Sequence, residues 1–186
     1  MRILYLGNLD SLLISWLQDQ DEIVIVTTDN VNDWDYLENY DFLISYNYRY
    51  ILKKKVLDKF MGRAINLHIS LLPWNRGADP NLWSWIDDTP KGVTIHQLDK
   101  GVDTGGILIQ RRTAFDHKKQ LTLRNTYEIL QSDIQDLFKE HWHQLRDGRI
   151  KPVPQQGKGS YHRMAGKEKI IHLLTDGWDT PVINLR

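Results

Sequence analysis

Short apolar runs alternate with amphipathic segments along much of the chain. The runs at residues 2–6, 22–26 and 42–45 are continuous and rich in aliphatic residues, which is typical of strands covered on both faces of a parallel sheet. Between the first two runs, apolar residues recur at helical spacing over residues 11–18. This order predicts the strand–helix–strand opening of an α/β fold.

The pattern continues with two further strands, a returning strand and a long helix. The runs at residues 64–67 and 93–98 resemble the earlier strands, and residues 107–112 are expected to return antiparallel after a glycine turn at residues 104–106. Helical spacing extends over residues 122–148. The predicted inner face of this helix consists of Leu123, Tyr127, Leu130, Ile134, Leu137, His141 and Leu145. We predict an α/β, Rossmann-like fold: a mostly parallel twisted sheet with helices on both faces and an antiparallel edge.

Two short helices and a C-terminal segment complete the predicted organisation. One short helix is expected to start with residues 53–59 and to end near Gly62, and the other to span residues 81–88. A chain of 186 residues suffices for one sizeable hydrophobic core. We expect residues 1–150 to form this core and residues 151–186 to form an extension packed on it, within a single domain.

Polar side chains lie at the ends of two predicted strands. Asn66 and His68 lie at the end of the run at residues 64–67, and Asp103 follows the run at residues 93–98. In open α/β sheets, ligands bind in the crevice outside the carboxyl ends of the strands. These three side chains are therefore candidates for one shared site.

An amide, an imidazole and a carboxylate suit the direct attack of an amine on a carbonyl carbon. The Asn66 amide can donate to the oxygen that becomes negative, and His68 can exchange a proton near neutral pH because the unperturbed pKa of histidine is about 6.5. Asp103 would fix the tautomer of His68 and stabilise its cation. A lone histidine at a strand end is more often a hydrogen-bonded buried residue than a catalyst. Asn66, His68 and Asp103 taken together, however, favour a catalytic site.

Two separated motifs carry a family resemblance. N-L-H-I-S-L-L-P at residues 66–73 and D-K-G-V-D-T-G-G-I at residues 99–107 resemble the paired motifs of the folate-dependent formyltransferases. The resemblance covers roughly residues 1–149. It implies a formyltransferase-type fold, an N-formyltransferase activity and formyl-tetrahydrofolate as co-substrate. We expect no metal. The resemblance also implies that Asn66, His68 and Asp103 are the catalytic residues.

The same resemblance implies a folate-binding segment before the first motif. Residues 50–52 occupy the stretch that forms the pterin pocket in that family, although an ordinary aromatic loop at the sheet edge remains the alternative. The residues for which the resemblance implies folate contact are Tyr50, Ile51, Leu52, Asp99 and Gly101.

Two segments are candidates for binding the acceptor substrate. Residues 74–76 follow the first motif and could border the acceptor cleft. Residues 159–162, G-S-Y-H, resemble a G-x-Y-H segment of sugar N-formyltransferases and of peptide-synthetase formylation domains. The alternative for this tail is a strap that closes the sheet edge. The resulting acceptor-binding candidates are Trp74, Asn75, Arg76, Tyr161, His162 and Lys167.

Composition limits the expected partners. Lysine plus arginine and aspartate plus glutamate both number 24, so no net field attracts the chain to nucleic acid or to a membrane. No apolar run is long enough to span a bilayer, and polar residues interrupt the N-terminal run too early for a signal peptide. The chain has no cysteine for disulfides or thiol catalysis, and we expect a cytoplasmic protein. G-N-L-D-S after the first strand lacks the further glycines of an NAD motif, and none of the seven histidines has a recognisable zinc spacing.

The acceptor remains open between several classes. The short length, the L-L-P-W-N-R-G-A-D-P-N-L-W segment and the G-S-Y-H tail favour a nucleotide-linked amino-dideoxy sugar of a bacterial surface-glycan or pseudaminic-acid-like pathway. A carrier-tethered amino acid is the alternative. A methionyl-tRNA formyltransferase ranks lower, because that enzyme carries a further nucleic-acid-contacting domain, whereas this neutral chain ends at Arg186. The intact set of Asn66, His68 and Asp103 argues against a catalytically silent folate-binding protein. The oligomeric state is not predicted.

Overall fold

A computed structural model of the protein describes residues 1–116 and 118–185. Two residues lie outside the described residues: His117, one of the seven histidines considered for zinc spacing, and Arg186, the last residue of the predicted extension. In the described part of the chain, no helix combines the length and the apolar character needed to cross a membrane. Among the same residues, no group of three or more His, Asp or Glu side chains is placed to hold a metal ion.

Six strands form one mixed sheet in the order β2–β1–β3–β4–β6–β7. These strands are β1 (Arg2–Gly7), β2 (Ile23–Thr27), β3 (Phe42–Tyr46), β4 (Ala64–His68), β6 (Gly92–Gln97) and β7 (Ile107–Arg112). The first four pair in parallel, whereas β6 pairs antiparallel with β4, and β7 pairs antiparallel with β6. The predicted fold class is therefore confirmed, including its antiparallel edge.

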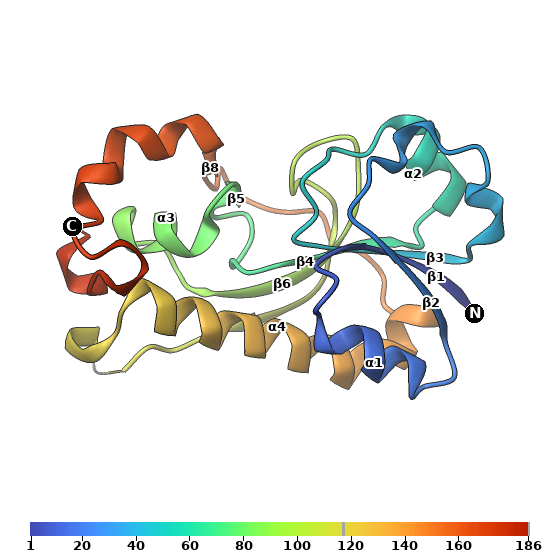
Figure 1. The fold of residues 1–186 in the computed structure, drawn as a ribbon, viewed down its shortest axis with the longest axis horizontal. Coiled ribbons are helices and arrows are strands. Elements are labelled where there is room, and N and C mark those ends of the chain that lie inside the picture. Colours follow the sequence, from blue (N-terminus) through green and yellow to red (C-terminus); the bar gives the residue numbers. More distant parts are fainter. Residues whose placement is uncertain (117, 186) are drawn as a thin grey trace.

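Helices cover both faces of this sheet (Figure 1). The α-helices of the described residues are α1 (Leu12–Gln18), α2 (Lys54–Phe60), α3 (Pro80–Ile86) and α4 (Leu123–Arg146). Alternate residues of β1 feed the two faces: Ile3 and Tyr5 join the apolar cluster that contains α1 and α4, whereas Leu4 and Leu6 join the cluster that contains α2. Burial on both sides explains why the strands read as continuous apolar runs.

The long helix α4 begins where the sequence predicts and buries a partly different face. Thr122 and Asn125 form a capping box at its start. One inner-face prediction needs correction, because His141 is only half-buried whereas Phe138 and Trp142 are fully buried. The two aromatic rings remove more apolar area from water than an imidazole would.

The direction of β6 differs from the one expected. The polar residues are expected to follow two strands whose carboxyl ends lie at the same edge of the sheet. Because β6 runs antiparallel to β4, its carboxyl end lies beside the start of β4, where Gln97 pairs with Ile65. The loop after β6 folds back along the sheet, and Asp103 in this loop has a left-handed backbone with φ of 51°. A Cβ on Gly105 would lie 1.8 Å from the Gln97 carbonyl oxygen, so the close return of the loop requires glycine there.

The C-terminal residues contact the core at several points. Val153 bridges Ile107, and β8 (Tyr161–His162) pairs in parallel with β5 (Arg76–Gly77). Val182 joins the apolar cluster of α4, and the red segment lies beside α3 in Figure 1. The division into core and extension stays a prediction. The 3-10 turns of the described residues are Val31–Asp33, Leu37–Asn39, Lys118–Gln120, Met164–Leu173, Gly177–Asp179 and Val182–Asn184.

Candidate active site

The central strands present polar side chains on the sheet face opposite α4. Asn66 and His68 lie two residues apart on β4 and therefore point to the same face. Ile65 and Leu67 belong to the apolar cluster of α4, which places the two polar side chains on the other side. His96 on β6 pairs directly with Asn66 and shares that face.

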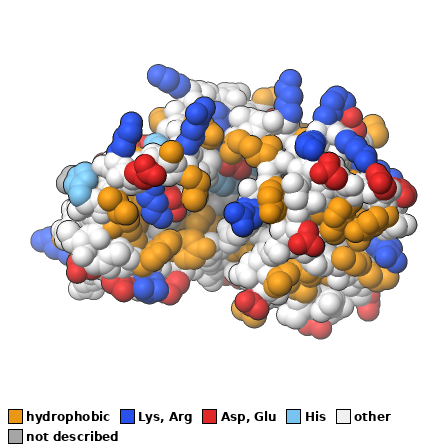
Figure 2. Space-filling model, turned by 45° about the horizontal axis from the view of Figure 1, so that its top comes forward, with side chains coloured by type: hydrophobic (Ala, Val, Ile, Leu, Met, Phe, Trp, Pro, Cys, Tyr) orange, Lys and Arg blue, Asp and Glu red, His pale blue; other side chains and the backbone are white. Residues whose placement is uncertain are grey.

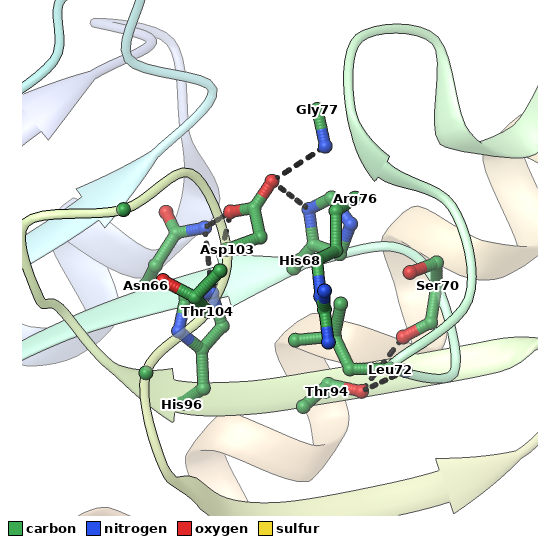
Figure 3. A network of polar contacts seen from close by, with 12 residues as sticks. Asn66, His68, Ser70, Leu72, Arg76, Gly77, Thr94, His96, Asp103 and Thr104 are labelled. Carbon is green, nitrogen blue, oxygen red and sulfur yellow. Dashed lines mark hydrogen bonds and ion pairs between the residues drawn. The ribbon is translucent and has the colours of Figure 1, made fainter. Parts of the chain in front are cut away.

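Asp103 reaches this polar patch from the loop after β6 (Figure 3). Its Oδ2 accepts a hydrogen bond from the Gly77 N–H at 2.8 Å, and its Oδ1 accepts one from the Asn66 amide at 3.1 Å. The His68 Nδ1 lies 3.7 Å from Oδ2. The structure thus brings together the amide, the imidazole and the carboxylate of the two sequence motifs.

The hydrogen bonds of His68 define which ring nitrogen carries the proton. Nε2 lies 3.0 Å from the backbone carbonyl oxygen of Asn75 and donates its hydrogen to it. In the neutral ring, Nδ1 therefore turns its lone pair toward Asp103. Burial lowers the pKa of His68 and outweighs the opposing effect of the Asp103 carboxylate. Asn75, and not Asp103 as expected, fixes the tautomer, and at neutral pH the ring can accept a proton.

Asp103 keeps its negative charge although it is largely buried. Burial alone raises the pKa of this carboxyl, but His68, His96 and the Gly77 N–H together outweigh burial and hold the pKa well below its usual range. A fixed negative charge therefore lies 3.7 Å from a nitrogen that can take up a proton. This arrangement stabilises the imidazolium form of His68 when it forms.

A second imidazole, that of His96, completes the cluster and belongs to neither motif. Its side chain is buried, and its Nδ1–H donates to the Gln97 carbonyl at 2.7 Å. Its Nε2 lies 3.2 Å from the amide nitrogen of Asn66 and 3.4 Å from Oδ1 of Asp103. The Asn66 amide thus contacts both Asp103 and His96. In the sequence, His96 lies within an apolar run and reads as core; the antiparallel register with β4 is the signal that reveals it.

Gln155 from the C-terminal segment holds the Asp103 loop. Its Nε2 donates to the backbone carbonyls of Asp103 at 2.7 Å and Gly105 at 2.9 Å. Its Oε1 accepts hydrogen bonds from the Arg76 guanidinium at 2.9 and 3.0 Å. One amide thereby links the loop to β5. No local motif marks Gln155, because its partners lie 50 to 79 residues away in the chain.

Two cavities meet at this cluster. Cavity A has a volume of about 490 Å³ and lies between residues 48–52 and residues 98–103, with Asn66 and Asp103 in its wall. Its wall also contains the five residues for which the family resemblance implies folate contact, Tyr50, Ile51, Leu52, Asp99 and Gly101. The structure therefore places these five residues around one space.

Cavity B, of about 410 Å³, lies against the same polar cluster. Asn66, His68 and Asp103 line it together with Tyr127 and Trp178, whose rings meet edge to face with centroids 5.3 Å apart. Asn66 and Asp103 line both cavities, so a molecule in either one can reach the same side chains. Figure 2 shows that the molecule is hollowed near the middle of its view, with hydrophobic side chains around the hollow.

The acceptor-binding candidates of the C-terminal segment lie near these cavities. Tyr161 and His162 line cavity A, and the His162 ring stacks on Trp83 with centroids 4.0 Å apart. Lys167 forms an ion pair with Asp79, which lines cavity B, at 3.3 Å. The segment that resembles G-x-Y-H thus contributes to the walls of the site.

The candidates after the first motif lie elsewhere. Trp74, Asn75 and Arg76 line neither cavity A nor cavity B. Asn75 is fully buried, and its side chain bonds the side chains of Thr89 and Ser160. These contacts hold the turn whose carbonyl fixes the tautomer of His68, and the predicted acceptor contact of the three residues stays a prediction.

Comparisons with known proteins give a consistent set of relatives. Residues 27–137 match the family model described as formyl transferase. The formyltransferase PseJ from Anoxybacillus kamchatkensis, crystallised with UDP-4,6-dideoxy-4-formamido-L-AltNAc and tetrahydrofolate, is 49% identical with a TM-score of 0.95 and is matched over 97% of its chain and 100% of this one.

Two curated relatives are matched over part of their length. A methionyl-tRNA formyltransferase of Clostridium botulinum (strain Alaska E43 / Type E3) is 37% identical over 76% of this chain and 46% of its own. A dTDP-4-amino-4,6-dideoxyglucose formyltransferase of Mycobacterium bovis is 32% identical over 60% of this chain and 46% of its own. The matched part of this chain spans about half the length of each of these relatives.

Proposed function

Because the chain belongs to the formyl transferase family, we propose that it transfers a formyl group from formyl-tetrahydrofolate to the amino group of a nucleotide-linked amino-dideoxy sugar. One observation carries the proposal: Asn66 and Asp103 line two cavities at once. One cavity can hold the formyl donor and the other the acceptor, with the reacting atoms between them.

Cavity A suits the folate donor. Leu98 and Val102 line it with apolar surface, and Ile51 in its wall is 64% exposed. A large apolar side chain exposed at a cavity is one that a bound ring system would cover. On the opposite wall, Asp99 accepts hydrogen bonds from the Gly101 N–H and from Thr104, which fixes the shape of the loop. Tetrahydrofolate is part of the PseJ complex, which supports the same donor here.

The three motif side chains suit direct transfer. The unprotonated acceptor amine attacks the formyl carbon, a new N–C bond forms, and the formyl oxygen gains negative charge. An N–H of Asn66 turns from its resting partner to that oxygen and stabilises it. The neutral Nδ1 of His68 takes the proton that the amine loses, and Asp103 stabilises the imidazolium. The proton then passes to the folate nitrogen as its bond to the carbon breaks, which leaves the formamide and tetrahydrofolate.

Cavity B suits a nucleotide-linked sugar. Trp178 in its wall is 47% exposed, and Tyr127 supports its ring from the side. Exposed aromatic faces stack on nucleobases, so this pair can receive the base while the sugar amine reaches His68. The sugar nucleotide of the PseJ complex supports this acceptor class. We place the reaction in the cytoplasm, which is compatible with a chain without cysteine.

The test is a search for formylated product across acceptor classes. The protein is incubated with formyl-tetrahydrofolate and with UDP- and dTDP-linked amino-dideoxy sugars, an aminoacyl carrier protein or methionyl-tRNA, and products are read by mass spectrometry. We expect a formyl mass increment on a nucleotide sugar, and its loss in Asn66→Ala. Formylation of the carrier protein or the tRNA alone would assign a different acceptor. No formylation of any acceptor would refute the proposal.

A further inference from the structure

Asp79 occupies a helix start without capping the helix. It precedes α3, where an aspartate commonly accepts a hydrogen bond from the backbone of the first turn. Here its side chain makes no such bond, and its backbone is left-handed with φ of 50° and ψ of 47°. Left-handed backbone is uncommon for a residue with a side chain. The carboxylate is thereby turned away from its usual partner.

One oxygen of this carboxylate has no partner among the described residues. Oδ1 lies 3.3 Å from the Lys167 Nζ. Oδ2 is shielded from water and accepts no hydrogen bond from any group of the described residues. A buried carboxylate oxygen normally has a hydrogen-bond donor, and an exception calls for an explanation. Asp79 lines cavity B, so a turn of its carboxylate about the Cβ–Cγ bond would let a molecule in that cavity supply the donor.

The position of Asp79 fits the neighbourhood of the reacting amine. Asp79 follows Gly77 by two residues, and the Gly77 N–H bonds Asp103 at 2.8 Å. Two residues of chain span at most about 7 Å, so Asp79 lies within about one sugar ring of the polar cluster. Asn66 and His68 line the same cavity. A sugar whose amine approaches His68 therefore places its neighbouring ring substituents within reach of Asp79.

We propose that Asp79 Oδ2 accepts a hydrogen bond from a hydroxyl or amide N–H on the ring of the acceptor sugar and so selects acceptors that carry such a donor beside the reacting amine. This inference rests on the proposed function. Lys167 holds the other oxygen at 3.3 Å. Asp79 is thus a specificity-determining residue that lies outside both sequence motifs.

The test pairs a change in the protein with a change in the acceptor. Asp79→Asn keeps the shape of the side chain, but an N–H group in the place of Oδ2 cannot accept a hydrogen. With an accepted nucleotide sugar, we expect the KM for the acceptor to rise by roughly 10- to 100-fold, which corresponds to the loss of a hydrogen bond to a charged group. We expect the KM for formyl-tetrahydrofolate to stay unchanged. Asp58→Asn, in the exposed Lys54–Asp58 pair on α2, is the matched control and is expected to leave both constants unchanged.

Acceptor analogues that lack one ring donor identify the bond. Wild-type protein should lose affinity for the analogue without the recognised donor, whereas Asp79→Asn should treat that analogue and the full acceptor alike. Lys167→Met separates a structural role: it should weaken both acceptors equally and preserve the discrimination between them. Equal discrimination in wild-type protein and Asp79→Asn overturns the inference.

The proposed function and this inference fail in different ways. If wild-type protein formylates no amino sugar, the proposed function fails and this inference with it. If wild-type protein formylates a sugar but uses every analogue that lacks one ring donor as well as the full acceptor, the inference alone is overturned. This second measurement needs no variant, so it can overturn the inference even if Asp79→Asn does not fold.

Discussion

Replacement of Asp103 by asparagine removes one charge from the site while the shape of the side chain is kept. The backbone of the loop should stay in place, because Gln155 holds the carbonyl oxygens of Asp103 and Gly105. Asparagine has a single acceptor oxygen, so either the Gly77 N–H or the Asn66 amide loses its partner. An unsatisfied buried donor costs about 1–3 kcal/mol of folding stability. The variant should therefore fold with a lowered melting temperature.

The effect on turnover follows from the distance between two charges. His68 Nδ1 and Asp103 Oδ2 are 3.7 Å apart, and both side chains are largely buried. At this distance, with an effective dielectric constant of about 20, the attraction between an imidazolium and a carboxylate is about 4 kcal/mol. If His68 becomes fully charged in the transition state, the loss of this attraction lowers kcat by about a thousandfold. A partial charge gives a proportionally smaller loss.

The assay is steady-state formyl transfer with a saturating nucleotide sugar. We expect Asp103→Asn to lower kcat by two to three orders of magnitude and to bind both ligands nearly as wild type. Asp147→Asn, which removes a carboxylate at the end of α4, is the charge-matched control and should retain full turnover. A folded Asp103→Asn protein with more than about a tenth of wild-type kcat would refute the electrostatic argument.

Three further predictions concern other parts of the site. Because burial lowers the pKa of His68, the unfolded chain binds more protons than the folded protein below pH about 6.5. The melting temperature should therefore fall as the pH drops below that value, and His68→Gln should flatten this fall. An unaltered slope in the variant would contradict the prediction. The lowered pKa of Asp103 should add a further loss near pH 4. Trp178→Ala should raise the KM for the nucleotide sugar by about tenfold through lost base stacking and leave the KM for formyl-tetrahydrofolate unchanged. Trp178→Phe should restore most of the affinity for the nucleotide sugar. Equal KM values in the wild type and both variants would exclude base stacking. Gln155→Leu should lower kcat about tenfold or more and folding stability by about 1–3 kcal/mol, because two backbone carbonyls lose their hydrogen-bond donor. An unchanged kcat would show that the Asp103 loop keeps its position without Gln155.

The sequence predicts best those features that depend on local pattern. Continuous apolar runs such as residues 42–45 correctly indicate doubly covered strands, and the two motifs supply the three side chains that meet at the cluster. Features that depend on strand pairing are not visible in one sequence. The antiparallel direction of β6 decides that His96 stands beside Asn66, and nothing in the apolar run around His96 encodes that register.

Long-range side-chain contacts escape prediction for a related reason. Gln155 reaches Asp103 across 52 residues, and a single glutamine in a polar stretch has no pattern that announces such a partner. Asp79 illustrates a further case: aspartate before a helix normally reads as a cap, and only its left-handed backbone and its place in cavity B reveal another use.

The wall shared by cavities A and B has a consequence for inhibitor design. Since Asn66 and Asp103 face both cavities, one compound that tethers a pteridine to an amino-sugar fragment could contact these two side chains from both spaces. Tethering makes the binding of the second fragment intramolecular. The affinity of the whole compound should therefore exceed that of either fragment by a factor set by linker length. If the amine attacks the formyl carbon directly, as proposed, no formylated enzyme forms, and initial-rate plots against both substrates should intersect instead of running parallel.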